Sequence, residues 1–176
     1  MDITIRPSQP GDITAITAIT NDAIEHTTAH FALKPDRVED VAAQFDRDRA
    51  RYPWFTAVDA EGRVVGFSRA AQWKSRTAYD WTVESSVYLA ESARGLGVGE
   101  RLYRTLFDEL ERRGFRCILA GVTVPNPPSE RLHERMGMAV VGEFPEVGYK
   151  FDQWLAVRYY AKLLGEGDPP RPTMIH

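Results

Sequence analysis

Apolar and polar residues alternate along the chain with two different periods, and these periods predict the order of its elements. Apolar residues three or four positions apart predict helices within residues 13–23, 36–51 and 98–110. Alternation with a period of two predicts strands within residues 3–5, 54–58, 63–71 and 81–89. Further strands are expected over 116–122, 138–142 and 150–163, and a short helix over 128–136. Because helices and strands are mixed along one chain, the pattern indicates a domain of the α/β (α+β) class.

Composition limits the chain to one globular domain. A length of 176 residues with 43% hydrophobic content is enough for a single core. The 22 basic and 25 acidic residues leave a net charge of -3, without the positive excess that general nucleic-acid binding requires. We therefore expect a domain over residues 1–164, a tail over 165–176 that is rich in Gly and Pro, and no nucleic-acid partner.

Metal, disulfide and membrane chemistry have little support in the sequence. Cys117 is the single cysteine, which excludes an intramolecular disulfide and a multi-cysteine zinc site, and the four His residues lack ligand spacing. The first residues lack the basic flank and apolar run of a secretory signal, and no apolar stretch approaches the ~20 residues that span a bilayer. The expectation is a soluble cytoplasmic protein with no metal and no membrane partner.

A glycine-rich segment between a strand and a helix carries the clearest chemical signal. Gly95, Gly97 and Gly99 follow the strand 81–89 and open the helix that begins near Val98. Glycines let backbone N–H groups converge, and a helix N-terminus attracts an anion, so the segment suits a pyrophosphate. Its G-x-G-x-G spacing differs from the G-x-G-x-x-G of dinucleotide-binding folds. A plain tight turn is the other interpretation of these glycines.

Separate stretches of the sequence resemble one known family. RGLGVG at residues 94–99 matches the Arg/Gln-x-x-Gly-x-Gly/Ala pyrophosphate loop of the GNAT superfamily of N-acetyltransferases. WKSRTAYDWTVESSVYL, PNPPSERLHERMGM and VGYKFDQW, at residues 73–89, 125–138 and 147–154, are similar to its phosphinothricin and methionine sulfoximine acetyltransferases. The resemblance implies the GNAT fold, a mixed and mostly antiparallel sheet of about seven strands flanked by four helices and splayed between the fourth and fifth strands.

The resemblance also implies an activity and a cofactor site. The activity is transfer of the acetyl group of acetyl-CoA to the α-amino group of a small amino-acid-like substrate, by direct attack in a ternary complex. Methionine sulfoximine, methionine sulfone and phosphinothricin are the substrate types of the family. Backbone groups of the strand before the loop are expected to bind the pantetheine arm. The cofactor-binding positions carried over are Val87, Tyr88, Leu89, Arg94, Gly95, Leu96, Gly97, Val98, Gly99, Glu100 and Asn126.

Acetylation of an amine requires a base that accepts the ammonium proton and a donor for the departing thiolate. Glu84 is the expected base, because it occupies the family's catalytic glutamate position. His133 occupies the position where many members of the superfamily have a tyrosine acid, and a histidine that simply packs is an equal interpretation. Tyr88 is a further possible proton donor. A backbone N–H of the same strand is expected to polarise the thioester carbonyl.

The resemblance also implies which residues near Glu84 bind the acceptor. The expected acceptor-binding residues are Lys74, Ser75, Arg76, Glu84, Ser85 and Ser86. Phe151 replaces the histidine of the Lys-His-Gly-x-Trp pattern of the phosphinothricin enzymes, which favours the methionine sulfoximine group. Four aromatic residues either line an apolar slot for the acceptor side chain or belong to the core, namely Trp73, Tyr79, Trp81 and Trp154.

Other functions are compatible with the same sequence. A mechanism in which Cys117 carries the acetyl group is disfavoured, because this residue alternates with Phe115 and Leu119 on a strand expected to be buried. An acetyltransferase for another small amine or a protein N-terminus shares the fold and cofactor, as does a non-catalytic acetyl-CoA-binding module. The resemblance further implies a homodimer.

Overall fold

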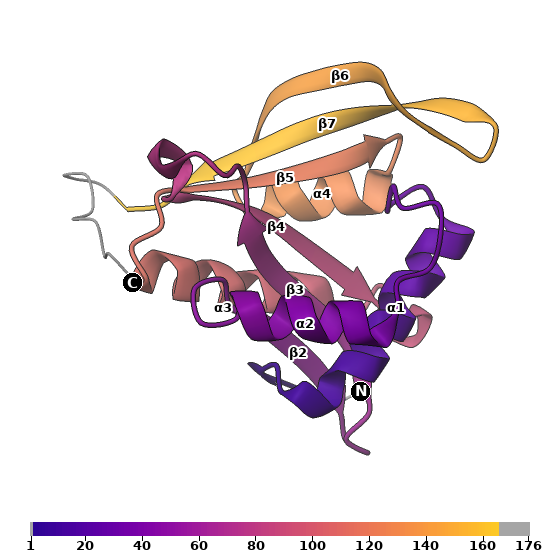
Figure 1. Cartoon of the computed structure of the whole chain (residues 1–176), viewed down its shortest axis with the longest axis vertical. Helices are drawn as coiled ribbons and strands as arrows, with labels where there is room; N and C mark the ends of the chain where they lie inside the picture. Colours follow the sequence, from indigo (N-terminus) through magenta and orange to yellow (C-terminus); the bar gives the residue numbers. More distant parts are fainter. Residues whose placement is uncertain (1, 166–176) are drawn as a thin grey trace.

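The computed structural model describes residues 2–165, which form one β-sheet with helices on both faces (Figure 1). The strands are β1 (Ile3–Pro7), β2 (Trp54–Asp59), β3 (Val64–Gln72), β4 (Thr82–Leu89), β5 (Cys117–Val124), β6 (Ala139–Lys150) and β7 (Gln153–Leu163). The helices are α1 (Ile13–His26), α2 (Val38–Asp48), α3 (Val98–Arg112) and α4 (Pro127–Arg135), with 3-10 turns at Pro10–Asp12, Thr77–Tyr79 and Glu91–Ala93. Within these residues the expected sheet and four helices are confirmed. The expected tail, apart from its first residue, lies outside the described residues.

The sheet is mixed and opens on one side of β4. Its strand order is β1-β2-β3-β4-β5-β7-β6, and every neighbouring pair is antiparallel except β4 and β5. A parallel pair needs a long crossover, which α3 provides here. β4 and β5 pair only over residues 82–84 and 117–119, although β4 continues to Leu89. The expected splay between the fourth and fifth strands is therefore confirmed.

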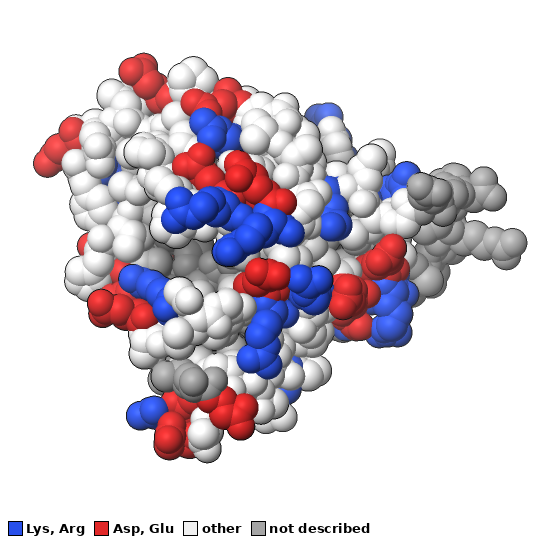
Figure 2. Space-filling view, turned by 180° about the vertical axis from the view of Figure 1, so that it is seen from behind, with Lys and Arg blue, Asp and Glu red and all other residues white. Residues whose placement is uncertain are grey.

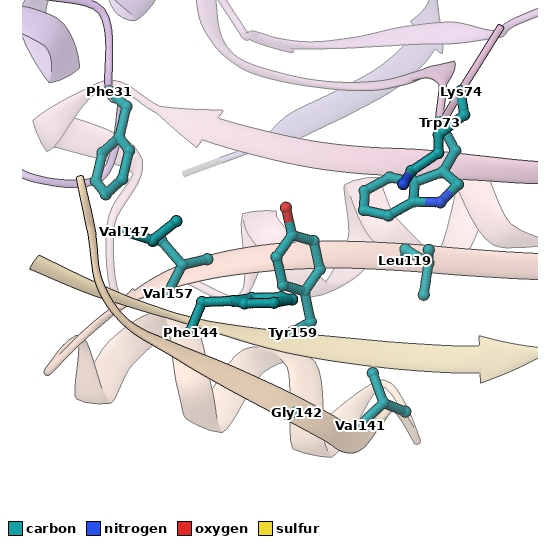
Figure 3. Close-up of a pocket in the computed structure, with 10 residues that line it drawn as sticks. All are labelled: Phe31, Trp73, Lys74, Leu119, Val141, Gly142, Phe144, Val147, Val157 and Tyr159. Atoms are coloured by element: carbon teal, nitrogen blue, oxygen red, sulfur yellow. The ribbon is translucent and has the colours of Figure 1, made fainter.

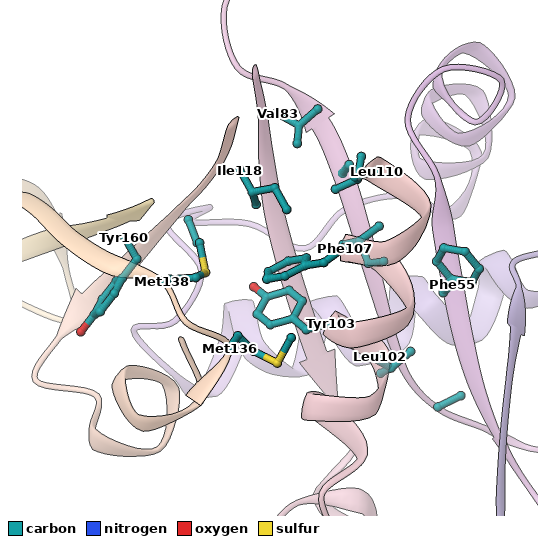
Figure 4. Packing of buried hydrophobic residues seen from close by; sticks show 14 of the residues in the cluster. Phe55, Val83, Leu102, Tyr103, Phe107, Leu110, Ile118, Met136, Met138 and Tyr160 are labelled. Carbon is teal, nitrogen blue, oxygen red and sulfur yellow. The ribbon is translucent and has the colours of Figure 1, made fainter. Parts of the chain in front are cut away.

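Two apolar clusters hold the helices against opposite faces of the sheet. On one face, α3 buries a four-residue repeat against β2, β3 and β4, in a cluster where Val83 and Ile118 are fully buried (Figure 4). The residues of this repeat are Val98, Leu102, Leu106 and Leu110. On the other face, Ile16 of α1 and Phe45 of α2 pack with Trp54 and Phe67 of the sheet. This arrangement leaves Glu84 and Tyr88 on the α1–α2 face and Val83 and Ser85 on the α3 face.

The C-terminal hairpin differs from the sequence prediction. β6 runs continuously over Ala139–Lys150, whereas the pattern predicts a strand only over 138–142 and a second one beginning at residue 150. Irregular pairing between Val140 and Gly142 and between Phe144 and Gly148 breaks the period of two, so the pattern does not show one strand. Phe151 and Asp152 then have φ angles of 51° and 58°, as in a two-residue type I′ turn. The hairpin lies at one edge of the sheet (Figure 1).

Charged side chains of both signs are interspersed on the surface. Figure 2 shows blue and red groups side by side, without a large field of one sign. Many form neighbouring pairs on α3, such as Arg104 with Glu100 at 2.8 Å and Arg112 with Glu109 at 2.8 Å. No helix within residues 2–165 is long and apolar enough to cross a membrane.

Candidate active site

The gap beside β4 exposes backbone that has a strand partner on one side only. Residues 83–89 of β4 pair with β3, but beyond Glu84 they have no partner in β5. Backbone N–H and C=O groups that lose a sheet neighbour need other partners. An extended ligand with amides of its own can take the place of the missing strand. The position of Val87, Tyr88 and Leu89 along this gap fits the pantetheine arm of acetyl-CoA.

Two glycines in the segment after β4 have a backbone that favours glycine. Gly95 and Gly97 have φ angles of +75° and +74°, in the left-handed region. A Cβ atom added to either would meet no atom within 4 Å, so this side of the loop faces open space. Gly97 is also the N-cap of α3, which directs the positive end of the helix dipole toward the loop. This open loop at a helix N-terminus fits a diphosphate.

The third glycine of the segment has a different role. Gly99 is buried inside α3, and an added Cβ would lie 3.3 Å from Leu132 of α4 and 3.5 Å from Leu89 of β4. Such distances are tight, so a glycine here permits α3 to pack closely against both elements. The sequence pattern does not distinguish the three glycines. In the structure, Gly95 and Gly97 shape the loop, whereas Gly99 permits close packing of α3.

Other residues of the loop supply one cation and several backbone groups. The Arg94 guanidinium lies 3.4 Å from the Asp22 carboxylate of α1 and 3.4 Å from the carbonyl oxygen of Leu89, and its side chain is half exposed. Leu96 is exposed, Val98 is buried in the core, and Glu100 pairs with Arg104 on the surface of α3. Arg94 is thus the side chain of the loop placed to approach an anion.

Glu84 has the environment of a base. It is the last residue of β4 that pairs with β5, so it lies where the gap begins. The side chain is half buried and makes no side-chain hydrogen bond or ion pair within residues 2–165. Burial raises the pKa of Glu84 above its usual value, and the charge of Arg69 partly offsets this rise. A carboxylate with a raised pKa accepts protons more readily near neutral pH.

Residues next to Glu84 on β4 divide between the two faces as their alternation predicts. Tyr88 and Ser86 share the face of Glu84, and Tyr88 packs against Phe67 and His30 with ring centroids 5.7 and 5.9 Å apart. Burial raises the pKa of Tyr88 to about 12, so its phenol stays protonated at neutral pH. Ser85 is buried on the other face, and its hydroxyl donates to the carbonyl of Leu119 at 3.3 Å.

His133 has no free ring nitrogen. Its Nδ1 lies 2.7 Å from the carbonyl oxygen of Ser129, and its Nε2 lies 3.2 Å from the hydroxyl of Tyr103. The ring is 3% exposed and packs between Tyr103 and Tyr160. Burial lowers the pKa of His133, which favours the neutral ring. These contacts favour the packing interpretation over the acid.

Asn126 lies where β5 ends and α4 begins. As the N-cap of α4, its side-chain oxygen accepts from the N–H of Ser129 at 3.3 Å, and its own N–H donates to Glu130 at 2.9 Å. The side-chain amide nitrogen makes no hydrogen bond within the described part of the chain. Asn126 thus stabilises α4 and retains donors for a cofactor.

A largely apolar cavity of about 490 Å³ lies between the end of β3, β5 and the β6–β7 hairpin (Figure 3). Leu119, which pairs with Glu84 across β4 and β5, is one of its walls, and the Tyr159 hydroxyl points toward the space below Trp73. The lining residues are Phe31, Trp73, Lys74, Leu119, Val141, Gly142, Phe144, Val147, Val157 and Tyr159. The volume suits a small molecule, and Lys74 supplies a positive charge at the wall.

The expected substrate loop contributes only in part to this cavity. Lys74 lines it, whereas Ser75 and Arg76 are exposed and do not. Of the four aromatic residues considered for an apolar slot, Trp73 alone is a wall. Trp154 is 62% exposed in the hairpin and packs on Tyr149, so the slot interpretation is wrong for it.

Several wall residues were not identified from the sequence. Val157 and Tyr159 alternate along β7 on the face toward the cavity, and this period of two could have indicated them. Phe31 comes from the connection between α1 and α2, where no periodic pattern exists. Its position follows only from contacts with β6, more than a hundred residues later in the sequence.

Cys117 is poorly placed and poorly activated for a nucleophile. It begins β5 opposite Thr82, at the other end of β4 from the glycine loop. Burial raises the pKa of its thiol, which lowers the thiolate fraction. These features disfavour a cysteine-bound acetyl group.

Comparisons with known proteins agree with this geometry. Residues 17–138 match the model of the Acetyltransferase (GNAT) family. The chain is 38% identical to phosphinothricin N-acetyltransferase of Streptomyces viridochromogenes, over 97% of this chain and 93% of the relative. It is 35% identical to the L-methionine sulfoximine/L-methionine sulfone acetyltransferase of Pseudomonas aeruginosa, over 90% and 93% of the two chains.

A solved structure extends the agreement to three dimensions. A GNAT superfamily phosphinothricin acetyltransferase from Sinorhizobium meliloti, in complex with acetyl-CoA, has a TM-score of 0.93 and 31% identity, over 99% of this chain and 95% of that one. The fold and the open loop beside the split sheet thus define an acyltransferase of the acetyl-CoA-dependent class. The chain belongs to the GNAT family and is an N-acetyltransferase.

Proposed function

We propose that this enzyme acetylates the α-amino group of a small amino-acid-like acceptor of the methionine sulfoximine, methionine sulfone or phosphinothricin type. The observation that carries the proposal is the position of Glu84. Its unpaired carboxylate lies where the β4–β5 gap begins, and its strand partner Leu119 is a wall of the apolar cavity. One side chain therefore adjoins both the expected cofactor path and a cavity for an acceptor.

The chain's own groups hold the cofactor in this proposal. Backbone groups of Val87, Tyr88 and Leu89 bind the pantetheine arm, while the N–H groups of residues 95–99 and the Arg94 guanidinium bind the diphosphate. Asn126 adds a contact from the end of β5. Acetyl-CoA supplies the activated acetyl thioester when it is bound.

In this proposal Glu84 acts as the general base and Tyr88 as the general acid. Glu84 accepts a proton from the acceptor ammonium, directly or through water, so that the free amine attacks in a ternary complex. The protonated Tyr88 side chain lies four residues further along the same face, beyond Ser86, and is the proposed donor to the departing sulfur. A backbone N–H of β4 polarises the carbonyl under attack. His133 is assigned a packing role, because both of its ring nitrogens are engaged.

The acceptor is placed with its side chain in the cavity and its carboxylate toward Lys74. Apolar walls suit the methyl-bearing side chain of a methionine derivative. Ser86, on the face of Glu84, is close enough along β4 to contact the amino group, whereas the buried Ser85 faces the other way. Phe151 lies in the hairpin turn outside the cavity, so it supports the sulfoximine choice only through the sequence resemblance.

A panel of acceptors tests the proposal. Thiol release from acetyl-CoA is measured with L-methionine sulfoximine, L-methionine sulfone, phosphinothricin, unmodified L-amino acids, and the α-carboxamide of each sulfur compound. We expect kcat/KM for the sulfoximine or sulfone to exceed that for glycine and for the carboxamides by at least about 10-fold. Background rates with every amino acid and analogue would contradict the small-acceptor assignment.

We further propose a homodimer formed through the outer face of the β6–β7 hairpin. Val140, Tyr149 and Trp154 are each more than half exposed there, which is unusual for one hairpin facing water. A self-complementary contact between two copies would cover them. Light scattering on the purified chain should give twice the mass of 19.9 kDa.

Two variants, one in the hairpin and one outside it, test the position of this interface. Trp154→Asp should shift the mass to that of one chain, whereas Val38→Asp, on the surface of α2, should leave it unchanged. A single-chain mass for the parent at micromolar concentration would contradict the dimer.

A further inference from the structure

The connection between α1 and α2 forms one wall of the acceptor cavity, yet few bonds of its own hold it. Its Phe31 ring is 37% exposed and lies near Val147 at one end of the cavity (Figure 3). Within the connection, short-range bonds link Ala29 to the Thr27 hydroxyl and Ala32 to the His30 ring, each at 3.1 Å. Other contacts hold it at its edges: Asn21 of α1 bonds the backbone of Asp36 at 3.0 and 2.8 Å, and the His30 ring packs on Tyr88 of β4. Around Phe31, two residues of β6 make the contacts with the sheet.

Lys150, the last residue of β6, binds the connection through backbone carbonyls. Its ammonium is buried and donates to the carbonyl oxygens of Ile24 at 2.5 Å and His30 at 2.7 Å. Within residues 2–165 it has no carboxylate partner inside 4.0 Å. Ile24 lies in the last turn of α1, where carbonyls lack intrahelical donors and a cation is favoured by the helix dipole. Lys150 therefore joins the end of α1 and the start of the cavity wall to the hairpin.

Gly148, two residues before Lys150 in β6, leaves room for the Phe31 ring. A Cβ added to Gly148 would lie 2.8 Å from both Cδ2 and Cζ of the Phe31 ring, and closer still to Cε2. The φ angle of Gly148 lies outside the left-handed region, so the backbone does not require glycine there. The absence of a side chain instead lets the ring lie directly on β6.

We propose that Gly148 and Lys150 form a loop-docking site that sets acceptor selectivity. Gly148 accepts the Phe31 ring, and Lys150 holds the backbone before it, at the end of α1 and at His30, so that together they fix the position of one cavity wall. The proposal rests on the function proposed above and adds two residues that act through Phe31. Lys150 is a positioning residue, because its ammonium donates to the carbonyls of Ile24 and His30 and does not line the cavity.

The Gly148→Ala variant tests the contact with the ring. The added methyl group must displace a side chain rather than backbone, so the fold should be retained while the cavity changes shape. We expect the ratio of kcat/KM between methionine sulfoximine and alanine to change by about 10-fold, with the KM for acetyl-CoA unchanged. In a Phe31→Ala background the same substitution should have no effect, because no ring remains to displace.

The Lys150→Met variant tests the backbone contacts. Losing the ammonium leaves two carbonyls without a donor, so the connection should separate from the hairpin. We expect the acceptor KM to rise by at least about 10-fold while the acetyl-CoA KM is unchanged. Cleavage by chymotrypsin after Phe31 and Leu33 should become faster. Lys162→Met is the matched control, since Lys162 also donates to a backbone carbonyl, that of Met136 at 2.7 Å, far from the connection.

These experiments separate the docking site from the proposed function. Unchanged cleavage in Lys150→Met, or equal effects of Gly148→Ala with and without the Phe31 side chain, would overturn the docking site even in an active enzyme. A parent enzyme that acetylates no amino acid would instead refute the proposed acceptor class. The cleavage comparison between Lys150→Met and Lys162→Met would then still decide whether Lys150 holds the connection.

Discussion

Replacing Glu84 by Gln lowers kcat for acetylation by about 10²- to 10³-fold, the range expected when a positioned general base is removed. Glutamine keeps the shape of the side chain but cannot accept the ammonium proton. Glu84 contacts neither the glycine loop nor an ion-pair partner within the described residues, so cofactor affinity should stay the same. Steady-state kinetics and calorimetric titration with acetyl-CoA measure the two effects separately.

The pH dependence of kcat in the parent enzyme also tests the role of Glu84. Glu84 acts as the ionised base, so activity should be lost as the pH falls through its pKa. Because burial raises this pKa above 4.5, the acidic limb should lie above the usual glutamate range. That limb should be absent from the residual activity of Glu84→Gln. Glu61→Gln, in the exposed β2–β3 turn, is the control and should behave as the parent does. A Glu84→Gln enzyme with the parent's kcat would remove Glu84 from the mechanism.

Substitution of Gly97 by alanine should weaken acetyl-CoA binding by about 100-fold, equivalent to about 2.7 kcal/mol or one to two hydrogen bonds to a charged group. Alanine disfavours the φ angle of +74°, so the loop should relax and its N–H groups should no longer converge. The new methyl group also points into the open space where the diphosphate is expected. Titration calorimetry measures the change.

Gly62 offers a closely matched control for this effect. It has a φ angle of +79° in the β2–β3 turn, and an added Cβ there also meets nothing within 4 Å. Both alanine variants should lose about 1 kcal/mol of unfolding free energy from backbone strain. Only Gly97→Ala should lose affinity for acetyl-CoA. Equal affinities in the two variants would show that the loop does not bind the diphosphate.

Much of the fold follows from periodic patterns that depend on neighbours close in sequence. The repeat from Val98 to Leu110 predicts α3, and the alternation around Glu84 predicts which side chains of β4 share a face. The splay beside β4 was predicted from family resemblance rather than from the pattern. No periodicity shows that two paired strands separate after Glu84, because the apolar pattern of β4 reports which face each side chain occupies and not which strand lies beside it.

Residues that shape the cavity were harder to predict because they act over long sequence separations. The Phe31 ring packs on Gly148, and Lys150 is buried against one carbonyl of α1 and one of the α1–α2 connection rather than exposed like most lysines. Trp154 is an aromatic residue suited to a cavity wall, but it lies exposed beside the hairpin turn and packs on Tyr149. Local sequence specifies the strand that carries Glu84, whereas the acceptor cavity depends on how distant segments meet.

A crystal structure of the protein with coenzyme A should show whether the gap beside β4 is the cofactor site. We expect the diphosphate on the backbone N–H groups of residues 95–99, with the pantetheine arm between β4 and β5 beside Val87 and Leu89. The sulfur should then lie at the start of the gap, next to the Glu84 carboxylate. Coenzyme A bound elsewhere on the chain, with the gap between β4 and β5 empty, would show that neither the glycine loop nor the gap binds the cofactor.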